Sequence, residues 1–253
     1  MSDQFVMNIF NKYHVKKELD PLTKMFVITP LHNVVMEWAG SCLNSVELSG
    51  SRAKGTATTL SSDFDLFISL KHDTENTLKE IYESLFNYLD QKGYKARKQN
   101  VSIGVHLWNT AVDLVPAKKR PGNTNDHSLY ISKRDTWTQT NVIRHINTVR
   151  DSGRIVEIVL LKVWRKLHGL DFPSIYLELT VLEALKGRSK SDPANNFLAL
   201  LDYLRDEFVD KTIVDPANTN NTISDDLFKY EKEAIRKKAK ESRSQQYWEN
   251  IIW

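Results

Sequence analysis

Residues 62–67 place two carboxylates on one face of a short apolar strand, and this pattern constrains the fold more than any other feature. Asp63 and Asp65 alternate with the apolar Phe64 and Leu66. Because successive side chains of a strand point to opposite faces, the two aspartates share one face and the apolar residues face a core. Carboxylates about 7 Å apart along a strand face can share hard cations. The segment therefore predicts a strand at the rim of a polar site.

The same alternation recurs in residues 112–115, an apolar segment that carries Asp113. We expect this strand to lie beside the first, so that Asp63, Asp65 and Asp113 converge. Placing three like charges together is costly, and such a cluster persists only where cations neutralise it. Two Mg²⁺ or Mn²⁺ ions held by carboxylates serve nucleotidyl transfer, since one activates an attacking hydroxyl and the other stabilises the leaving pyrophosphate. The alternative is that the three are exposed strand-end aspartates bonded to turn amides.

A glycine-serine turn lies eleven residues before the strand segment at residues 62–67. Gly50 and Ser51 follow a predicted strand at residues 44–48, and Gly55 closes the turn. Two glycines let the backbone approach a phosphate closely and expose amide donors. Alone, such a segment is most often a plain turn. Together with the strand carboxylates it indicates a nucleotide site.

Hydrophobic periodicity predicts an α+β front half and an all-helical back half. In the front half we expect a helix at residues 20–43 that breaks or restarts at Pro30, strands at 44–48 and 64–70, a helix at 74–91, and strands at 94–97, 101–108 and 111–115. Asn109 and Thr110 are expected to form a two-residue hairpin turn, and Pro116 to end the sheet. From about Thr138 onward the pattern is helical, with helices expected at residues 142–149, 156–167, 175–185, 197–208 and 224–248 and a loop at 215–224.

Composition excludes several classes of protein. The chain has 253 residues and a formal net charge of +3, so any contact with nucleic acid must be a local patch. Cys42 is the only cysteine, which excludes an internal disulfide and a Cys-rich zinc module. The apolar stretches are too short for a membrane span, and the first residues lack the pattern of a secretory signal. We therefore expect a cytoplasmic protein without membrane contact.

With these residues in view, the sequence resembles the DNA-polymerase-β-like nucleotidyltransferase superfamily, whose signature is Gly-Ser, a gap, Asp-x-Asp and a later strand carboxylate. Gly50, Ser51, Asp63, Asp65 and Asp113 match that signature position by position. Downstream blocks at residues 160–164, 172–179 and 214–221 are similar to the oligoadenylate synthase and CD-NTase branch.

The resemblance implies an α+β architecture in two lobes. A palm-like catalytic lobe with a mixed sheet, flanking helices and an N-terminal helix is expected over residues 1–137. A helical nucleotide-binding lobe is expected over residues 138–253, with the active-site cleft between the two. The three aspartates are implied to be catalytic and to hold two Mg²⁺ or Mn²⁺ ions, with nucleoside triphosphates as substrates.

The resemblance also implies four residues that contact the donor triphosphate, namely Gly50, Ser51, Lys162 and Ser174. From the residues alone, Lys162 could equally be a snorkelling surface lysine. Ser174 could equally cap a helix beside Pro173.

Base recognition is not predicted. Where relatives often place an aromatic residue directly after the serine, this chain has Ile175, with Tyr176 one position later. Trp137, Trp164 and Trp248 are expected in the core rather than as platforms for bases.

We therefore expect a metal-dependent nucleotidyltransferase that joins nucleoside triphosphates into a cyclic or linear oligonucleotide second messenger and releases pyrophosphate. The resemblance connects this activity with antiviral signalling and with an activator or a downstream effector protein as partner. The alternatives are nucleotidyl transfer to an RNA 3′ end or to a protein side chain, and a non-catalytic nucleotide-binding scaffold, against which the intact aspartates argue. RNA would contact the basic residues 118–120, whereas residues 229–243 are expected to form a solvated charged helix.

Overall fold

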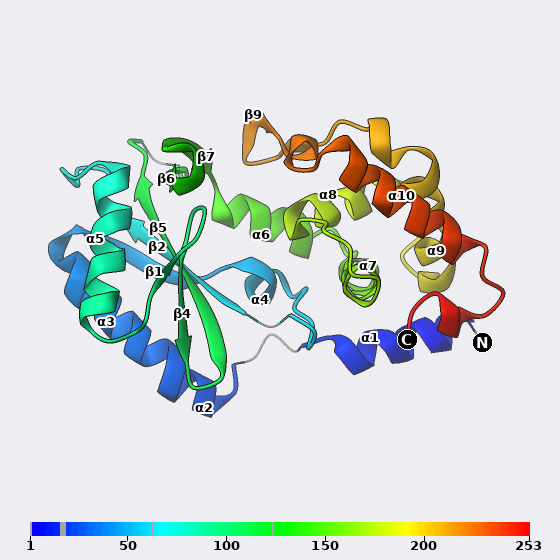
Figure 1. Ribbon diagram of the computed structural model, residues 1–253, viewed down its shortest axis with the longest axis horizontal. Helices are drawn as coiled ribbons and strands as arrows, with labels where there is room; N and C mark the ends of the chain where they lie inside the picture. The colour runs from blue at the N-terminus through cyan, green and yellow to red at the C-terminus, as the bar shows by residue number, and fades with distance from the viewer. Residues whose placement is uncertain (1, 16–18, 62, 123) are drawn as a thin grey trace. The chain divides into compact units, whose positions relative to one another are not determined.

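The computed structural model describes residues 2–15, 19–61, 63–122 and 124–253, and the chain divides into two compact units (Figure 1). The sheet unit comprises Lys16–Lys54 and Ser62–Ile146, and the helical unit comprises Met1–Val15, Gly55–Ser61 and Asn147–Trp253. The division into lobes over residues 1–137 and 138–253 that the resemblance implies stays a prediction. Contacts within the described residues place the first helix with the helical unit.

The sheet unit is built on a mixed sheet, which has seven strands over its described residues. These strands are β1 (Leu43–Leu48), β2 (Phe64–Leu70), β3 (Arg97–Lys98), β4 (Ile103–Leu107), β5 (Thr110–Lys119), β6 (His127–Ile131) and β7 (Thr136–Thr140). The order is β1-β2-β5-β4-β3, and β6 pairs with β5 and with β7. β2 and β5 are parallel and the other pairs are antiparallel. The two carboxylate-bearing strands are therefore neighbours.

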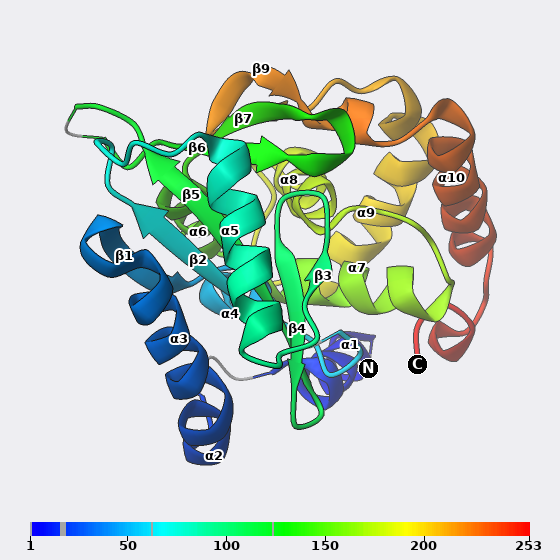
Figure 2. The same ribbon diagram turned by 60° about the vertical axis from the view of Figure 1, so that its left-hand side comes forward.

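Helices α3 (Thr29–Ala39) and α5 (Leu78–Gln91) cover one face of the sheet (Figure 2). Leu31 and Leu85 are fully buried between these helices and the apolar side chains of β2, β4 and β5. Helix α5 starts at Leu78 because Thr77 caps it with a reciprocal capping box. This cap leaves the apolar stripe of α5 against the sheet.

Shorter helical segments connect these elements. They are α2 (Pro21–Thr23), a π turn (Lys24–Ile28), a 3₁₀ turn (Gly40–Cys42), α4 (Gly50–Lys54), a 3₁₀ turn (Ser132–Arg134) and α6 (Val142–Arg150). Pro30 lies in the first turn of α3, where its missing N–H is not needed. The predicted restart at Pro30 is confirmed.

The helical unit packs its helices around α8 and α7. It contains α1 (Ser2–Tyr13), α7 (Ile155–Leu167), α8 (Ser174–Ala184), α9 (Pro193–Asp206), α10 (Lys229–Arg243), the hairpin of β8 (Val214–Asp215) and β9 (Asn218–Thr222), and 3₁₀ turns at Phe208–Asp210, Ile223–Asp226 and Trp248–Asn250. The predicted helices are confirmed, but the expected loop at 215–224 holds the hairpin and the last helix begins at Lys229. Trp164 is fully buried and donates to Ser242 at 3.0 Å. Over the described residues, no helix is both long and apolar enough to cross a membrane.

The sheet extends further than predicted at Pro116. Strand β5 continues to Lys119, and Pro116 pairs with Ile68 of β2. The expectation was wrong because Pro116 falls between the residues that pair with β4 and those that pair with β6. A residue without an N–H is tolerated where a strand edge is unpaired.

The β6–β7 hairpin was not foreseen in the sequence. The helical pattern expected from Thr138 was wrong there, because β7 runs to Thr140. Trp137 lies on β7 with 56% of its surface exposed, so its expected place in the core was also wrong. The β4–β5 turn is shifted by one residue from the prediction, since Leu107 pairs with Thr110.

Candidate active site

The strand carboxylates Asp65 and Asp113 lie side by side in the sheet. The parallel register of β2 and β5 pairs the two residues directly. Residues paired in register point to the same face, which here is the face opposite the core formed with α3 and α5. Both side chains are half-buried. The expectation that the second carboxylate strand lies beside the first is confirmed.

Asp63 lies just before β2 and is exposed. Its negative charge acts on Asp113, because it raises the pKa of that carboxyl group. No group of three or more His, Cys, Asp or Glu side chains within the described ranges is arranged to hold a metal ion. The oxygen donors of Asp63, Asp65 and Asp113 are nevertheless of the kind that Mg²⁺ prefers.

Gln99 orients Asp113. Its Nε2 donates a hydrogen bond of 2.7 Å to Asp113 Oδ1. Burial raises the pKa of Asp113 above its ordinary value; the bond from Gln99 opposes this rise and the charge of Asp63 adds to it. A Cβ at Gly104 would lie 2.6 Å from Gln99 Nε2 and 3.2 Å from Asp113 Oδ1. Sequence reasoning missed Gln99 because it follows β3 and reaches the site only through the pairing of β3 with β4 and of β4 with β5.

The Gly-Ser pair begins helix α4, where the sequence predicts only a turn. Gly50 has a φ of +58°, and a Cβ at this position would lie 1.6 Å from Asp65 Oδ2. Only glycine fits, since any side chain would take the place of the carboxylate. The backbone N–H of Ser49 donates to the carbonyl oxygen of Asp65 at 2.8 Å. These contacts hold the start of α4 against β2.

Two further residues of α4 lie close to this strand. Ser51 follows Gly50 and is half-buried. The Arg52 guanidinium lies over the ring of Phe64, with its central carbon 4.2 Å from the ring centroid. Burial lowers the pKa of Arg52, although it remains a cation at physiological pH. Arg52, for which the sequence predicted no role, thus has its side chain beside the Asp-x-Asp strand.

Lys162 is buried in the helical unit. Its Nζ forms an ion pair of 2.6 Å with Glu178 Oε1 and donates to Thr56 Oγ1 at 2.8 Å. The Thr56 hydroxyl also donates to Glu178 Oε1 at 3.0 Å. A snorkelling surface position is therefore excluded. Sequence reasoning missed Glu178, although it interrupts an otherwise apolar run in α8.

The segment 55–61, which contains Thr56, joins the two parts of the Gly-Ser and Asp-x-Asp motif along the chain. Further bonds hold it in the helical unit: the His14 ring nitrogen Nε2 lies 3.0 Å from the Gly55 carbonyl oxygen. The backbone N–H of Val15 donates to the carbonyl oxygen of Ala57 at 3.0 Å. Lys162 is thus one of several anchors for the connection between Gly50 and Asp65.

Ser174 is the first residue of α8 and is exposed. Its Oγ accepts a hydrogen bond of 3.2 Å from Arg165 Nη1, while Pro173 occupies the N-cap. Tyr176 is fully buried and packs at 5.2 Å from the Phe208 ring. Tyr176, two positions after Ser174, therefore belongs to the core of the helical unit.

Comparison with known proteins matches the part of the chain that carries the Gly-Ser pair and the aspartates to a family model. Residues 36–122 match the family model described as a nucleotidyltransferase domain. The chain contains a nucleotidyltransferase domain. This domain runs from within α3 to just beyond β5 and includes Gly50, Ser51 and all three aspartates, so the predicted class of enzyme is confirmed. No curated protein matches the sequence.

Solved structures share the fold of this nucleotidyltransferase. CdnC of E. coli MS115-1 with ATP is similar at 18% identity and a TM-score of 0.77, covering 95% of this chain and 89% of that one. The CD-NTase CdnG of Bradyrhizobium diazoefficiens with GTP is similar at 11% identity and a TM-score of 0.74, covering 99% and 94%. The Cid1 poly(U) polymerase with MgATP reaches 11% identity and a TM-score of 0.68, covering 97% and 95%. The predicted α+β nucleotidyltransferase fold is confirmed.

Proposed function

We propose that this nucleotidyltransferase joins nucleoside triphosphates into a cyclic or linear oligonucleotide second messenger and releases pyrophosphate. The observation that carries the proposal is the direct pairing of Asp65 with Asp113, with Gly50 packed against the Asp65 carboxylate. Glycine fits there because its φ is +58° and because a Cβ would lie 1.6 Å from Asp65 Oδ2.

The aspartates are proposed as the catalytic residues and as the metal ligands. Asp63, Asp65 and Asp113 supply carboxylate oxygens and would hold two Mg²⁺ or Mn²⁺ ions. Bound there, such ions would lower the pKa of an attacking hydroxyl and neutralise the triphosphate. Asp113 is also proposed to accept the proton of the acceptor hydroxyl. Gln99 keeps Asp113 Oδ1 in place for this step.

Four residues are proposed to bind the donor triphosphate. Gly50 and Ser51 offer backbone amides and a hydroxyl at the start of α4. Ser174 offers an exposed hydroxyl that Arg165 orients. Lys162 is proposed to contribute a positive charge, and its bonds to Glu178 and Thr56 support an additional role as a positioning residue for segment 55–61.

The messenger product is favoured by the likeness to CdnC and CdnG, whose structures with ATP and GTP are similar over nearly the whole chain. A protein partner is part of the proposal, because CdnC was also solved in a CdnC:HORMA-deltaN complex. We place the activity in cytoplasmic antiviral signalling. The second candidate is nucleotidyl transfer to an RNA 3′ end, which the likeness to the Cid1 poly(U) polymerase favours.

The test is a product assay with the purified chain. It is incubated with four radiolabelled ribonucleoside triphosphates and Mg²⁺ or Mn²⁺, treated with phosphatase, and the products are resolved. A parallel reaction contains single-stranded RNA. A phosphatase-resistant small product supports the messenger synthase, whereas extension of the RNA alone supports the second candidate.

Two variants make the assay specific to the site. Asp65→Asn removes one carboxylate charge at nearly constant volume and should abolish either product. Asp90→Asn makes the same change at an exposed position of α5 and should leave turnover unchanged. Full activity of Asp65→Asn would refute the proposed site.

A further inference from the structure

A groove on the sheet unit combines positive charge with an exposed tryptophan. This Trp137 groove has a volume of about 400 Å³. It is lined by His72, Thr77, Leu78, Lys118, Lys119, Arg120, Pro121, Ser128 and Trp137. The lining residues come from the end of β5 and the two residues after it, from β6 and β7, from the start of α5, and from the segment after β2. The Lys79–Asp135 ion pair of 3.0 Å ties the β6–β7 turn to that end of α5.

The charge of the groove has one sign. Lys118, Lys119 and Arg120 line it, and no Asp or Glu stands among its described lining residues. The neighbouring Asp73 and Glu75 are exposed but lie outside the lining. Such a concentration of unbalanced cations attracts polyanions.

Trp137 supplies an aromatic surface within this field. Its side chain is 56% exposed, and the Arg120 guanidinium carbon lies 5.8 Å from its ring centroid. A large aromatic side chain left open to water beside a guanidinium matches the platforms on which unpaired bases stack.

The spacing of the cations suits a strand of phosphates. Lys118 and Arg120 are two residues apart along the chain, which corresponds to about 7 Å in an extended backbone. Within the described residues, Lys118 Nζ donates one hydrogen bond, of 3.3 Å, to the backbone carbonyl oxygen of Asn76. Its ammonium therefore keeps donors for an anion.

The groove is separate from the proposed catalytic site. Lys118 pairs with Leu70 and Asp113 with Asp65 on the same two strands. Lys118 lies five positions after Asp113 on β5, and an odd separation places the two side chains on opposite faces of the sheet. A ligand in the groove would thus not occupy the position of the catalytic carboxylates.

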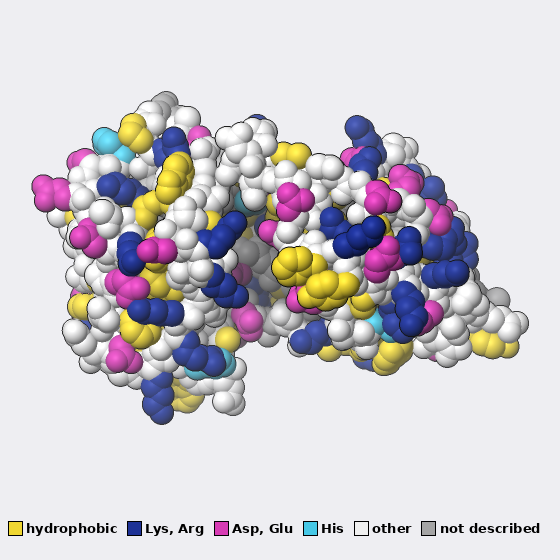
Figure 3. Space-filling view, turned by 45° about the horizontal axis from the view of Figure 1, so that its top comes forward, with side chains coloured by type: hydrophobic (Ala, Val, Ile, Leu, Met, Phe, Trp, Pro, Cys, Tyr) yellow, Lys and Arg dark blue, Asp and Glu magenta, His cyan; other side chains and the backbone are white. Residues whose placement is uncertain are grey.

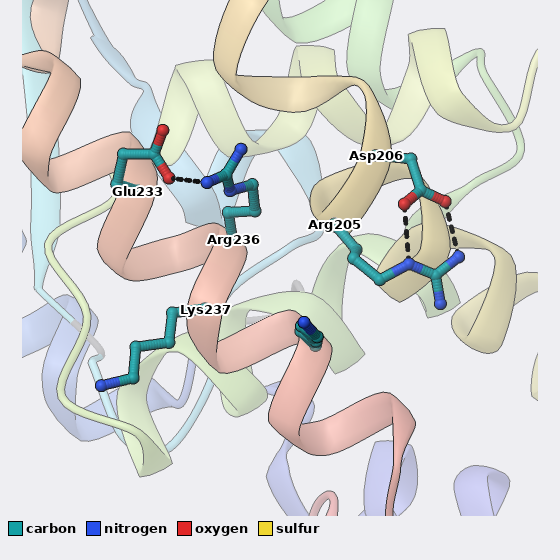
Figure 4. A pocket seen from close by; sticks show the side chains of 6 residues that line it. Arg205, Asp206, Glu233, Arg236 and Lys237 are labelled. Atoms are coloured by element: carbon teal, nitrogen blue, oxygen red, sulfur yellow. Dashed lines mark hydrogen bonds and ion pairs between the residues drawn. The ribbon is translucent and has the colours of Figure 1, made fainter.

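A second basic hollow, of about 550 Å³, lies between α9 and α10 in the helical unit. Figure 4 shows its Arg236 paired with Glu233 and its Arg205 paired with Asp206. Lysines and arginines also gather over the surface of this unit in Figure 3. Two of the four cations are paired with acids, and no aromatic side chain stands among the described lining residues. This hollow therefore fits a solvated helix face, as the sequence predicts for residues 229–243.

We propose that the Trp137 groove binds single-stranded nucleic acid, with a base stacked on Trp137 and adjacent phosphates on Lys118 and Arg120. This inference goes beyond the proposed function, because it assigns a second polyanion site on the sheet unit. It does not depend on which acceptor the enzyme uses.

The test is fluorescence anisotropy of labelled eight-nucleotide RNA and DNA strands with the full chain across a series of salt concentrations. Trp137→Ala should weaken binding about tenfold, the effect of losing one base stack. The double change Lys118→Gln and Arg120→Gln should reduce the slope of log K against log salt by about 1.4, the contribution of two phosphate contacts with a single strand. Each variant is first checked for a native circular dichroism spectrum.

The matched control is the double change Lys237→Gln and Lys240→Gln in the hollow of Figure 4, which removes the same charge and should change affinity less than twofold. The same anisotropy titration is made with Asp65→Asn, which should be inactive. Unchanged nucleic-acid binding by this variant would show that the groove binds independently of catalysis. Binding of the single strands that depends on Trp137 supports the proposal, and a difference between the RNA and DNA affinities shows which polymer the groove prefers. Wild-type affinity of Trp137→Ala, equal binding of a duplex, or an equal loss in the control would overturn it.

Discussion

Removing the ammonium of Lys162 should destabilise the protein strongly. The pair of Lys162 and Glu178 has a separation of 2.6 Å, and their side chains are 5% and 1% exposed. In Lys162→Met the Glu178 carboxylate keeps the Thr56 hydroxyl at 3.0 Å and the charge of Arg165, but it loses the ammonium that contacts it. Breaking one partner of such a pair costs about 3–5 kcal/mol, which is a large share of the typical free energy of unfolding of about 5–15 kcal/mol.

The assay is urea unfolding followed by circular dichroism, with thermal unfolding beside it. The matched control is Lys211→Met, which breaks the ion pair of Lys211 and Glu183 at 2.8 Å, where both side chains are 39% exposed. An exposed pair is worth about 0.2–1 kcal/mol, so the control should lose at most about 1 kcal/mol. The thermal midpoint of Lys162→Met should fall by about 10 °C.

The double variant Lys162→Met with Glu178→Leu completes the cycle. Replacing both buried charges by apolar side chains removes the unpaired carboxylate, so most of the lost stability should return. The reasoning is refuted if Lys162→Met costs no more than Lys211→Met, or if the double variant is as unstable as Lys162→Met alone.

Three further substitutions test the sites described above. Gly50→Ala places a methyl group in the Asp65 carboxylate position and should lower turnover by roughly three orders of magnitude in the product assay; near-normal turnover would contradict the packing argument. Asp113→Asn should raise the thermal midpoint at neutral pH while abolishing activity, because burial raises the pKa of Asp113 and the folded state therefore disfavours its charged form. A lower midpoint would show that the carboxylate stabilises the fold. Burial lowers the pKa of His127 below 6.5, so the folded chain binds fewer protons than the unfolded chain and stability is lost as the pH falls from 6.5 toward the folded pKa. His127→Gln should flatten urea-derived stability over that interval, and an unchanged curve would rule out this histidine as its source.

Much of the sheet unit could be predicted from local patterns. The strand Phe64–Leu70 is found at its predicted bounds, because alternation of buried and polar residues is a property of the segment itself. The apolar stripe also predicts helix α5, but the expected start at residue 74 was four residues early, because Thr77 caps the helix and it begins at Leu78. That the strand of Asp113 lies beside the strand of Asp65 was also predicted, whereas the parallel direction and the direct pairing of the two residues come from the structure.

The errors fall where distant segments decide the local structure. Pro116 remains within β5 because its neighbours on one edge change from β4 to β6. The β6–β7 hairpin forms because β5 offers it an edge, and this pairing leaves Trp137 exposed. No short-range pattern carries information about such an edge.

The sequence by itself therefore determined the chemistry: the carboxylate face, the Gly-Ser pair and the class of enzyme. Only the tertiary structure decided how these residues are supported. It placed Gln99 on Asp113, fitted Gly50 against Asp65 and buried Lys162 with Glu178. The physical reason is that residue type and spacing encode which charges a strand can present. The partners that orient or neutralise those charges come from segments far along the chain, and only packing brings them together.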